Sequence, residues 1–590
     1  MTTIAGELTA DGEHIVLVAG GSDVDVAAAA RQLKLLTPLI SQSDPPGAVT
    51  LPATWPAVVQ LTHVYGVSWR PGPRLVEWTQ EEIRRRNGGA PDLAYTPPDG
   101  LTPYPWQLEG AQMIASVGKV LLTDEPGTGK TITAILGIVE RGGQDDPVWP
   151  VVCVVPASVV DPWVEAWRTW APARRTVAWR GTPAQRRKLA GTADVYVASY
   201  DTARIDAPPE AHSRGGRPLL DLEPGAVVVD ECHLIKNQRS LRSLAVRRLT
   251  RHADTVVALS GTPITHHPGD LWPTLVALEP AAWPSRERWV DRYCQSVSGD
   301  YDEEIIGLHP HREPEFRTTL LGATRRVAKA DVLSQLPPKV YSVRTVELPQ
   351  AWRKIYDDVE SKMLAELPDG EELSVMSVLA QLTRLSQLAS AAADIAVSTE
   401  VDEDGVEHEH VTVTLKRPSW KVDALLEVLA ERPGQAVGVF APSRQLITLA
   451  GEAAAKAGYR VGYVVGGQCM TERTETVNAF QSGELDVICC TTGAGGVGLT
   501  LTAARTAVFL QRPWSIVEAM QAEDRFHRIG SEQHDSIEIV DVVAARTIDT
   551  RVRAVLREKA GQLGDLVQDP RIVTELLGGT PESTPDRKAA

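Results

Sequence analysis

The sequence has few cysteines and no long apolar run. Only six of its 590 residues are cysteine and none forms a Cys-x-x-Cys pair, which argues against a zinc site or a disulfide framework. No charge-free apolar stretch approaches the ~18 residues of a membrane span. The first residues lack the basic start and apolar core of a signal peptide. We therefore expect a protein of a reducing cytoplasm, with no membrane partner.

An excess of positive charge is also missing. Lys and Arg number 60 against 76 Asp and Glu, a formal net charge of −16. This balance argues against a protein coated non-specifically in nucleic acid, although a local basic groove stays compatible with it. Arginine outnumbers lysine, and Ala and Val are abundant, which favours a prokaryotic or viral gene of high GC content. A hydrophobic share of 43% and a charged share of 23% are those of a globular protein.

What is present is a repeated alternation of strand and helix patterns, which predicts two parallel α/β lobes. The first lobe has predicted strands at 120–122, 151–155, 195–198, 227–229 and 256–259, and the second at 436–440, 460–465, 487–490, 506–510 and 537–540. A length of 590 residues suits more than two domains. We predict an accessory domain (1–95), a first lobe (96–285), a linker with helical insertions (286–430), a second lobe (431–565) and a tail (566–590).

The accessory domain carries no visible chemistry. In the accessory domain we expect a strand at 13–18 and helices at 24–36 and 75–86, and either a role in substrate or partner contact or a stabilising cap on the first lobe. The linker should contain helices at 352–367 and 373–391. Its acidic stretch 399–409 reads as a surface loop or hairpin, and the polar end 578–590 as disordered.

The most informative segment is Asp124-Glu125-Pro126-Gly127-Thr128-Gly129-Lys130-Thr131, which lies between a predicted strand and a predicted helix. Gly127 and Gly129 allow backbone N–H groups to turn around an anion, and the helix adds its positive N-terminal end. Lys130 would place a charge on the β- and γ-phosphates, and the Thr131 hydroxyl would ligate Mg²⁺. The usual pattern has glycine where Asp124 stands. An ordinary glycine turn is the alternative.

A second segment, Asp230-Glu231, ends a run of three valines typical of a buried parallel strand. Ligands bind at that end of open α/β sheets. Asp230 would hold Mg²⁺, and Glu231 would orient and deprotonate the attacking water. A helix cap is the alternative for an isolated Asp-Glu pair, but the spacing from the phosphate loop favours the catalytic interpretation. Together the two segments predict binding and hydrolysis of a nucleoside triphosphate with Mg²⁺.

The second lobe adds a run from Gln521 to Gly530 that contains Arg525 and Arg528. Three residues apart on a helix, these arginines would share a face and serve as arginine fingers. An exposed helix with salt bridges is the alternative, because Glu523 and Asp524 are adjacent. A glycine-rich run after a buried strand, which includes Thr492 and Gly498, allows close approach to a phosphate of the nucleotide or of a nucleic acid.

In this order, the motifs resemble those of superfamily-2 helicase-like motors, and specifically the Swi/Snf-type DNA-dependent ATPases. The resemblance covers roughly residues 100–560. Asp124 is typical of this family, and the run Arg325-Arg326 to Leu336-Pro337-Pro338-Lys339 is a specific match that general helicases lack. Thr500, where most members have Asn, and the wording of 521–530 are closest to the annealing-helicase or fork-remodelling branch.

The resemblance implies a fold and further site residues. The fold would be two RecA-like parallel-sheet lobes with a small N-terminal α+β domain, and ATP would lie between the lobes. Gln107 would contact the adenine base, and Asp124, Thr128, Gly498 and Gln521 would join the nucleotide site. Ser260, Gly261 and Thr262 would couple hydrolysis to movement. The expected nucleic-acid contacts are Pro156, Ser199, Thr492 and Trp514, and Trp163 would belong to a segment that tracks DNA.

The expected function is therefore a DNA-stimulated ATPase that translocates on duplex or forked DNA with low sequence specificity, with protein partners through residues 1–95. One alternative is a strand-separating helicase or a restriction-type motor subunit, which would share every ATPase motif. A non-catalytic DNA-binding scaffold is the alternative of another class. The intact Lys130, Asp230, Glu231 and Arg528 argue against a scaffold.

Overall fold

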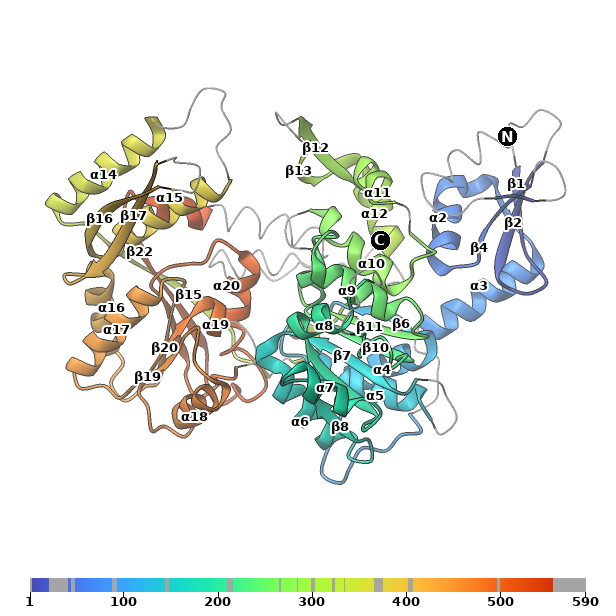
Figure 1. The fold of residues 1–590 in the computed structure, drawn as a ribbon, viewed down its shortest axis with the longest axis horizontal. Coiled ribbons are helices and arrows are strands. Elements are labelled where there is room, and N and C mark those ends of the chain that lie inside the picture. The colour runs from blue at the N-terminus through green and yellow to red at the C-terminus, as the bar shows by residue number, and fades with distance from the viewer. Residues whose placement is uncertain are drawn as a thin grey trace, which may run out of the picture. The chain divides into compact units, whose positions relative to one another are not determined.

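The computed structural model describes residues 3–20, 41–43, 48–86, 93–143, 148–209, 216–264, 267–283, 285–298, 303–320, 324–333, 335–365, 375–401, 407–495 and 499–554. The chain divides into two compact units, Met1–Val332 and Leu333–Ala590. Figure 1 labels their elements, and each unit is treated separately below. Among the described helices, none is both long enough and apolar enough to cross a membrane.

A seven-stranded parallel sheet forms the centre of the first unit. Its strand order is β14-β6-β11-β10-β7-β9-β8, and all neighbours run parallel. The central strands are valine-rich and buried along nearly their whole length, as expected for a sheet covered on both faces. The five predicted strands of this lobe are confirmed as β6 (Lys119–Leu122), β7 (Val151–Val155), β9 (Val195–Ser199), β10 (Ala226–Asp230) and β11 (Thr255–Leu259). The sheet also contains two edge strands that were not predicted, β8 (Thr176–Ala178) and β14 (Thr324–Arg325).

The helices of this lobe follow the strands in alternation. Local sequence sets several boundaries: Ser199, Ser240 and Ser285 accept N-cap hydrogen bonds, and Gly118 ends α4 with a φ of 78°. The elements are α4 (Pro105–Val117), α5 (Lys130–Arg141), α6 (Val160–Trp170), α7 (Pro183–Leu189), α8 (Tyr200–Asp206), α9 (Leu241–Thr250), α10 (Trp272–Leu278), α11 (Arg286–Tyr293), α12 (Glu313–Leu320), α13 (Lys329–Val332) and the hairpin β12 (Cys294–Ser298) with β13 (Glu303–Leu308).

The N-terminal part of this unit is a smaller α+β fold. Its sheet has the order β3-β4-β2-β1-β5, and Ile15, Leu51, Leu61 and Trp69 lie in its core. The predicted strand at 13–18 is β2 and the predicted helix at 75–86 is α3, whereas the predicted helix at 24–36 lies outside the described residues. The elements are β1 (Thr3–Leu8), β2 (His14–Gly20), β3 (Ser41–Ser43), β4 (Ala48–Pro52), α2 (Trp55–Tyr65), β5 (Trp69–Pro71) and α3 (Pro73–Arg86).

The second unit is built on a six-stranded parallel sheet with the order β15-β22-β21-β18-β20-β19. Its edge strand β15 comes from residues assigned above to the linker. β15 pairs with β22 alone, over eight residues, and its side chains are half-buried or exposed. Its sequence therefore lacks the continuous apolar run of the buried strands, which makes the strand hard to recognise. The strands are β15 (Lys339–Val346), β18 (Val437–Ala441), β19 (Val461–Val464), β20 (Val487–Thr491), β21 (Thr506–Phe509) and β22 (Ile537–Ala544).

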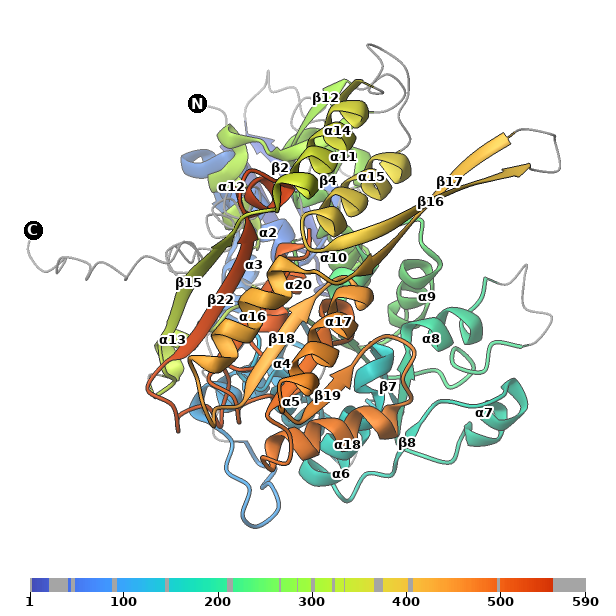
Figure 2. The ribbon, with the colours of Figure 1, turned by 90° about the vertical axis from the view of Figure 1, so that its left-hand side faces the viewer.

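Helices and one long hairpin complete the second unit. Residues 399–401 and 407–409 of the acidic stretch belong to two antiparallel strands that project well beyond the sheet, as Figure 2 shows. Predicted helices at 352–367 and 373–391 correspond to α14 and α15. The elements are α14 (Gln350–Ala365), α15 (Val375–Leu388), β16 (Ala392–Val401), β17 (Glu407–Lys416), α16 (Trp420–Ala430), α17 (Arg444–Lys456), α18 (Met470–Gln481), α19 (Thr492–Gly495) and α20 (Ile516–Glu523).

Candidate nucleotide site and arginine segment

Three neighbouring strands of the first unit end in the same row. Leu122 of β6 pairs with Leu259 of β11, and Leu259 pairs with Asp230 of β10. The phosphate loop 123–129, the predicted coupling residues 260–262 and the carboxylate pair 230–231 therefore leave the sheet side by side. This carboxyl edge of a parallel sheet is where such folds bind ligands.

The phosphate loop encloses the ammonium group of Lys130. Gly127 and Gly129 have φ angles of 90° and 88°, which side chains with a Cβ rarely adopt. Lys130 begins α5, and its Nζ donates to the carbonyl oxygens of Asp124 at 2.6 Å and Glu125 at 3.2 Å. Thr128 is almost fully buried and donates to the Glu125 carbonyl, whereas Thr131 is half-buried in the first turn of α5. The segment has the form of an anion-binding loop.

The side chain of Gln107 is hydrogen-bonded to the phosphate loop. Its Nε2 donates to the Thr128 carbonyl at 3.0 Å, and its Oε1 accepts from the Tyr104 N–H. A Cβ on Gly129 would come 2.1 Å from Gln107 Nε2, so a side chain at position 129 would displace the Gln107 amide. Both ends of this buried amide are used within the protein, and the predicted contact with a base stays a prediction.

The unusual first residue of the loop has a charged partner. Asp124 is 1% exposed, and its Oδ2 accepts a hydrogen bond from Arg325 Nη1 at 2.8 Å. Burial raises the pKa of Asp124, while Arg325 and Lys130 act in the opposite direction. A second Arg325 nitrogen donates to the Trp106 carbonyl at 2.7 Å. The position that is glycine in the usual phosphate loop is therefore an aspartate here, and it forms an ion pair with Arg325, far along the chain.

Asp230 is a carboxylate whose pKa is raised. Burial and the adjacent Glu231 raise its pKa to about 6, although a hydrogen bond from Trp163 and the charge of Lys130 lower it. Trp163 Nε1 donates to Asp230 Oδ2 at 2.9 Å, and the Tyr200 hydroxyl donates to the Asp230 carbonyl at 2.6 Å. Lys130 is thus close enough to Asp230 for their charges to interact, as a shared nucleotide site requires.

His233 links Glu231 to the coupling residues. Glu231 adopts a left-handed backbone with φ of 50°, a strained conformation often found at functional sites. Its Oε2 lies 3.3 Å from His233 Nδ1, and the same nitrogen lies 3.1 Å from Ser260 Oγ. Ser260 Oγ also accepts from the Thr262 N–H at 3.2 Å. A continuous set of contacts therefore runs from the carboxylate to the start of the coupling residues.

Gly261 contacts the phosphate loop itself. A Cβ at this position would lie 2.7 Å from the Cδ and Cγ of Pro126, closer than real Cβ contacts. The Ser260 N–H donates to the Leu122 carbonyl immediately before the loop. Of the three residues predicted to couple hydrolysis to movement, Gly261 therefore packs against the loop, and Thr262 is bonded to Ser260, which contacts His233.

In the second unit, the helix predicted for the arginine motif is wrong. Helix α20 ends at Glu523, and Arg525 and Arg528 lie in the turns after it. The chain leaves the helix because Phe526 enters the core, where its ring packs over Gly438 so closely that a Cβ would come within 2.3 Å. Tertiary packing of one aromatic residue thus overrides the helical spacing.

The two arginines nevertheless converge on one backbone atom. Arg525 Nη1 and Arg528 Nη1 both donate to the Leu499 carbonyl, at 3.3 and 2.9 Å. Arg528 also donates to Thr500 Oγ1 at 3.0 Å, and burial lowers its pKa while Asp524 opposes this. Gln521 lies on α20 and is 9% exposed. Gly498 lies outside the described residues.

The alternative of an exposed, salt-bridged arginine helix is also excluded. Glu523 is fully buried, and it binds Arg512 at 2.5 Å and accepts from the Tyr341 hydroxyl at 2.9 Å. Asp524 lies 3.2 Å from Lys339 Nζ. Although burial disfavours a charged group, Asp541 and Glu523 raise the pKa of Arg512. Glu523 and Asp524 therefore fix the arginine segment, residues 521–530, to the rest of the second unit. They do not form an exposed charged surface.

The predicted nucleic-acid residues are largely occupied within their own units. Pro156 is buried after β7, and Ser199 Oγ accepts from the Thr202 N–H as the N-cap of α8. Thr492 is 1% exposed at the start of α19, and Trp514 packs against the core of the second unit. Pro156 and Ser199 do lie at the same carboxyl edge as the nucleotide loop. Their contact with nucleic acid stays a prediction.

The comparisons with known proteins agree with this geometry. A model of the SNF2-related domain matches residues 74–392, and a model of the helicase conserved C-terminal domain matches residues 420–530. The chain belongs to the SNF2-related family. The resemblance inferred from the motifs is confirmed, as is the α/β fold with two parallel sheets.

Several SNF2-related proteins are similar over most of the chain. The human DNA annealing helicase and endonuclease ZRANB3 is 28% identical over 470 residues, 76% of this chain and 38% of that protein. The SWI/SNF-related matrix-associated actin-dependent regulator of chromatin subfamily A-like protein 1 of Xenopus tropicalis is 27% identical, covering 79% of this chain and 45% of that protein. The chain thus spans less than half the length of these relatives.

The chain is also similar to one solved structure, the Sulfolobus solfataricus SWI2/SNF2 ATPase core in complex with dsDNA. It is 19% identical, with a TM-score of 0.36, and the match covers 81% of this chain and 98% of that one.

Three contacts of this SNF2-related site are not evident from the motifs. His233 follows the acidic pair without a predicted role, and Trp163, expected to lie in a DNA-tracking segment, donates to Asp230. Arg325 is recognisable only as a family mark. The available signal was Asp124 itself, because a carboxylate in a loop that folds into the interior requires a cationic partner.

Proposed function

We propose that the chain is a DNA-stimulated ATPase, a motor that uses ATP to translocate on duplex or forked DNA. The observation that carries the proposal is the alignment of Leu122, Leu259 and Asp230 in one row. This row brings the Lys130 loop, the acidic pair and the coupling residues to one edge of the sheet. The family supports an ATP-driven motor, and the relatives named above are described as annealing helicases or chromatin regulators.

Binding of the triphosphate would fall to the phosphate loop and α5. Loop N–H groups from Gly127 to Lys130 would surround the phosphates, and Lys130 Nζ would exchange its two loop carbonyls for β- and γ-phosphate oxygens. In this role Asp124 shapes the loop and Gln107 supports it. The ordinary nucleotide for such a loop is ATP.

The residues present fit Mg²⁺. Among the described residues no cluster of three or more His, Cys, Asp or Glu side chains could form an all-protein metal cage. Mg²⁺ is usually held by one or two oxygen ligands together with phosphates and water, which Asp230 and Thr131 would supply. The raised pKa of Asp230 indicates a buried carboxylate that a cation would stabilise in its charged form. Bound there, the ion would neutralise charge that develops on the phosphates.

The remaining residues have distinct tasks. Glu231 would orient and deprotonate the attacking water, with His233 holding its carboxylate. Arg525 and Arg528 would supply positive charge to the transferring phosphoryl group, while Gln521 and Gly498 complete the nucleotide site. Ser260, Gly261 and Thr262 would relay changes at the phosphates to the rest of the first unit.

DNA would be contacted mainly through its phosphates, so specificity for sequence should be low. Because the side chains of Pro156 and Thr492 are buried, we propose that DNA is contacted by the Thr492 N–H and by the backbone N–H groups that follow Pro156, which has none itself. Ser199 and Trp514 stay proposed contacts. Residues 1–95 remain proposed as a surface for protein partners. The six free cysteines suit a cytoplasmic location.

A binding assay and a strand-displacement assay test the proposal together. Fluorescent ATP should bind with Mg²⁺, and Lys130→Ala should weaken binding by at least about tenfold, because the lysine charge faces the phosphates. Triplex displacement on duplex DNA should report translocation, whereas release of a labelled strand from a fork would favour the strand-separating alternative. Binding of DNA with no ATP turnover would favour the scaffold.

A further inference from the structure

A short stretch of chain, residues 324–341, crosses the boundary between the two units at Val332 and Leu333. We call it the connector. Its sequence is a family mark to which no role was assigned above. Its described residues make two dense sets of contacts, one inside each unit. Each set involves residues that the proposed function places at the nucleotide.

The first end of the connector is hydrogen-bonded along the phosphate loop. Thr324 and Arg325 form β14 beside the end of β6, and the Arg325 carbonyl accepts from both the N–H and the hydroxyl of Thr123. Two residues on, the Val327 carbonyl accepts from the Glu125 N–H at 3.0 Å. The connector thus continues the sheet directly along the loop that holds Lys130.

Side chains reinforce this attachment. Arg325 binds the buried carboxylate of Asp124 at 2.8 Å, and Arg326 lies 3.3 Å from Glu125 Oε1. The Lys329 N–H donates to Glu125 Oε2 at 2.9 Å. Arg325 is 13% exposed and Asp124 1%, so solvent screens the pair little. Two consecutive loop residues, Asp124 and Glu125, are therefore held by the connector.

The second end is fixed to the arginine segment. Lys339 Nζ lies 3.2 Å from Asp524 and 3.5 Å from Glu523, both part of the run between Gln521 and Arg525. The Tyr341 hydroxyl donates to Glu523, and the ring of His527 contacts the Pro337 carbonyl at 2.9 Å. The connector therefore holds residues on both sides of Arg525 and next to Arg528.

We propose that the connector is a mechanical link between the phosphate loop and the arginine segment, with Arg325 and Lys339 as the positioning residues at its two ends. The inference rests on the proposed function, because it concerns how one ATPase site is kept in step across two units. A displacement of the second unit by DNA would pull on residues 324–329 and so on the loop around Lys130. Cutting either end should disable the same link.

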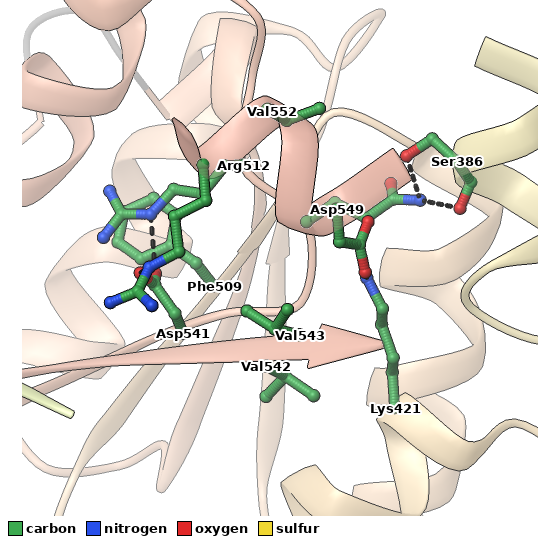
Figure 3. A pocket seen from close by; sticks show the side chains of 11 residues that line it. Ser386, Lys421, Phe509, Arg512, Asp541, Val542, Val543, Asp549 and Val552 are labelled. Atoms are coloured by element: carbon green, nitrogen blue, oxygen red, sulfur yellow. Dashed lines mark hydrogen bonds and ion pairs between the residues drawn. The ribbon is translucent and has the colours of Figure 1, made fainter. Parts of the chain in front are cut away.

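A small cavity in the second unit does not support a ligand site. The small cavity of about 20 Å³ in Figure 3 is lined by Lys421, Asp549, Arg512 and Asp541. Its charges are already paired, Lys421 with Asp549 and Arg512 with Asp541. A volume near that of one water leaves no room for a larger ligand.

A double-mutant cycle on the full-length chain tests the link. Arg325→Gln and Lys339→Gln should each lower the ratio of DNA-stimulated to DNA-free kcat about tenfold. If both cut one link, the double variant should also lose about tenfold, whereas independent defects multiply to about a hundredfold. Lys339→Arg, which keeps the charge facing Asp524, should restore turnover.

A matched pair outside the connector provides the control. Arg432 and Glu538 lie 2.6 Å apart in the second unit and are 13% and 21% exposed. Arg432→Gln should leave stimulated turnover nearly unchanged, and its effect should simply multiply with that of Arg325→Gln. If Arg325→Gln lowers Tm by more than about 5 °C, Arg325→Lys replaces it, since lysine cannot reach Asp124 and Trp106 together.

The outcomes separate the link from the function. A hundredfold loss in the double variant, or single variants that lower stimulated and DNA-free turnover equally, would overturn the link while leaving the motor intact. A wild-type chain whose turnover ignores DNA would instead refute the proposed function. A double variant no worse than the poorer single variant, in a chain that DNA stimulates, supports the link.

Discussion

Ser260 reaches Glu231 through one atom, because His233 Nδ1 lies 3.1 Å from Ser260 Oγ and 3.3 Å from Glu231 Oε2. The side chain that we assign to activating water is thereby connected to the residues that leave β11. A change in the position of the Glu231 carboxylate must alter this contact. The arrangement gives a physical route by which the state of the nucleotide can be sensed.

Replacing His233 should therefore reduce turnover more than binding. His233→Ala removes the partner that orients Glu231, so we expect kcat to fall about tenfold or more with the KM for ATP changed little. Steady-state ATPase assays give both constants. His252→Ala, at an exposed histidine after α9, is the matched control. A normal kcat for His233→Ala would show that Glu231 needs no such support.

Gly261 should be intolerant of any side chain. The added methyl of Gly261→Ala would press on Pro126 and displace the phosphate loop, since the available distance is 2.7 Å. We expect the KM for ATP to rise several-fold to about tenfold, an effect of the size that small misplacements cause. Gly307→Ala, whose Cβ would meet no atom within 4 Å, should behave as wild type. Equal KM values for the two variants would contradict the close packing.

Asp230 should cost the protein stability at neutral pH. Burial and Glu231 raise the pKa of Asp230 from 3.8 to about 6, so the folded chain binds this proton more tightly than the unfolded chain. The penalty for the ionised carboxylate is complete above pH 6 and fades as the pH falls toward 4. Asp230→Asn should therefore raise Tm at pH 7.5, raise it less at pH 5.5, and abolish ATPase activity.

Thermal unfolding across this pH range checks the sign. Asp254→Asn, at an exposed carboxylate in the same unit, is the matched control. If Asp230→Asn destabilises the protein at pH 7.5, the carboxylate is paired more favourably than its buried position beside Glu231 implies.

Arg528 should stabilise the transition state of hydrolysis, and Thr500 should position the Arg528 side chain. Arg528→Ala should lower kcat by about a hundredfold or more, as for the loss of a charge that stabilises a phosphoryl transition state, with ATP binding nearly intact. Thr500→Val removes only the hydroxyl that accepts at 3.0 Å, so a loss of a few-fold is expected. Single-turnover hydrolysis separates the chemical step from binding. Comparable losses in both variants would mean that Arg528 acts through Thr500 alone.

Much of this site could be predicted because its residues sit at strand ends. Valine-rich or apolar runs at 120–122, 227–229 and 256–259 predict a buried parallel sheet, and that topology places the residues after each strand at one edge. The chemistry of Lys130, Asp230 and Glu231 can then be inferred from residue type and spacing.

The contacts that hold the site could not be predicted in the same way. Asp124 and Arg325 are 201 positions apart, and no local pattern links them. The end of α20 depends on Phe526 entering a space left by Gly438, which only the folded sheet reveals. Edge strand β15 was missed because its half-covered pattern resembles a connecting segment. In each case tertiary packing decided what local propensity left open.

The most direct test of the motor is the rate of ATP hydrolysis by the purified chain with and without duplex DNA. We expect a stimulation of at least about tenfold at saturating DNA, with the rate falling to background in Lys130→Ala and in Glu231→Gln, because one intact site must serve both conditions. Forked and single-stranded DNA in parallel would define the preferred substrate. A rate that duplex and forked DNA leave unchanged, or a Lys130→Ala variant with full activity, would contradict it.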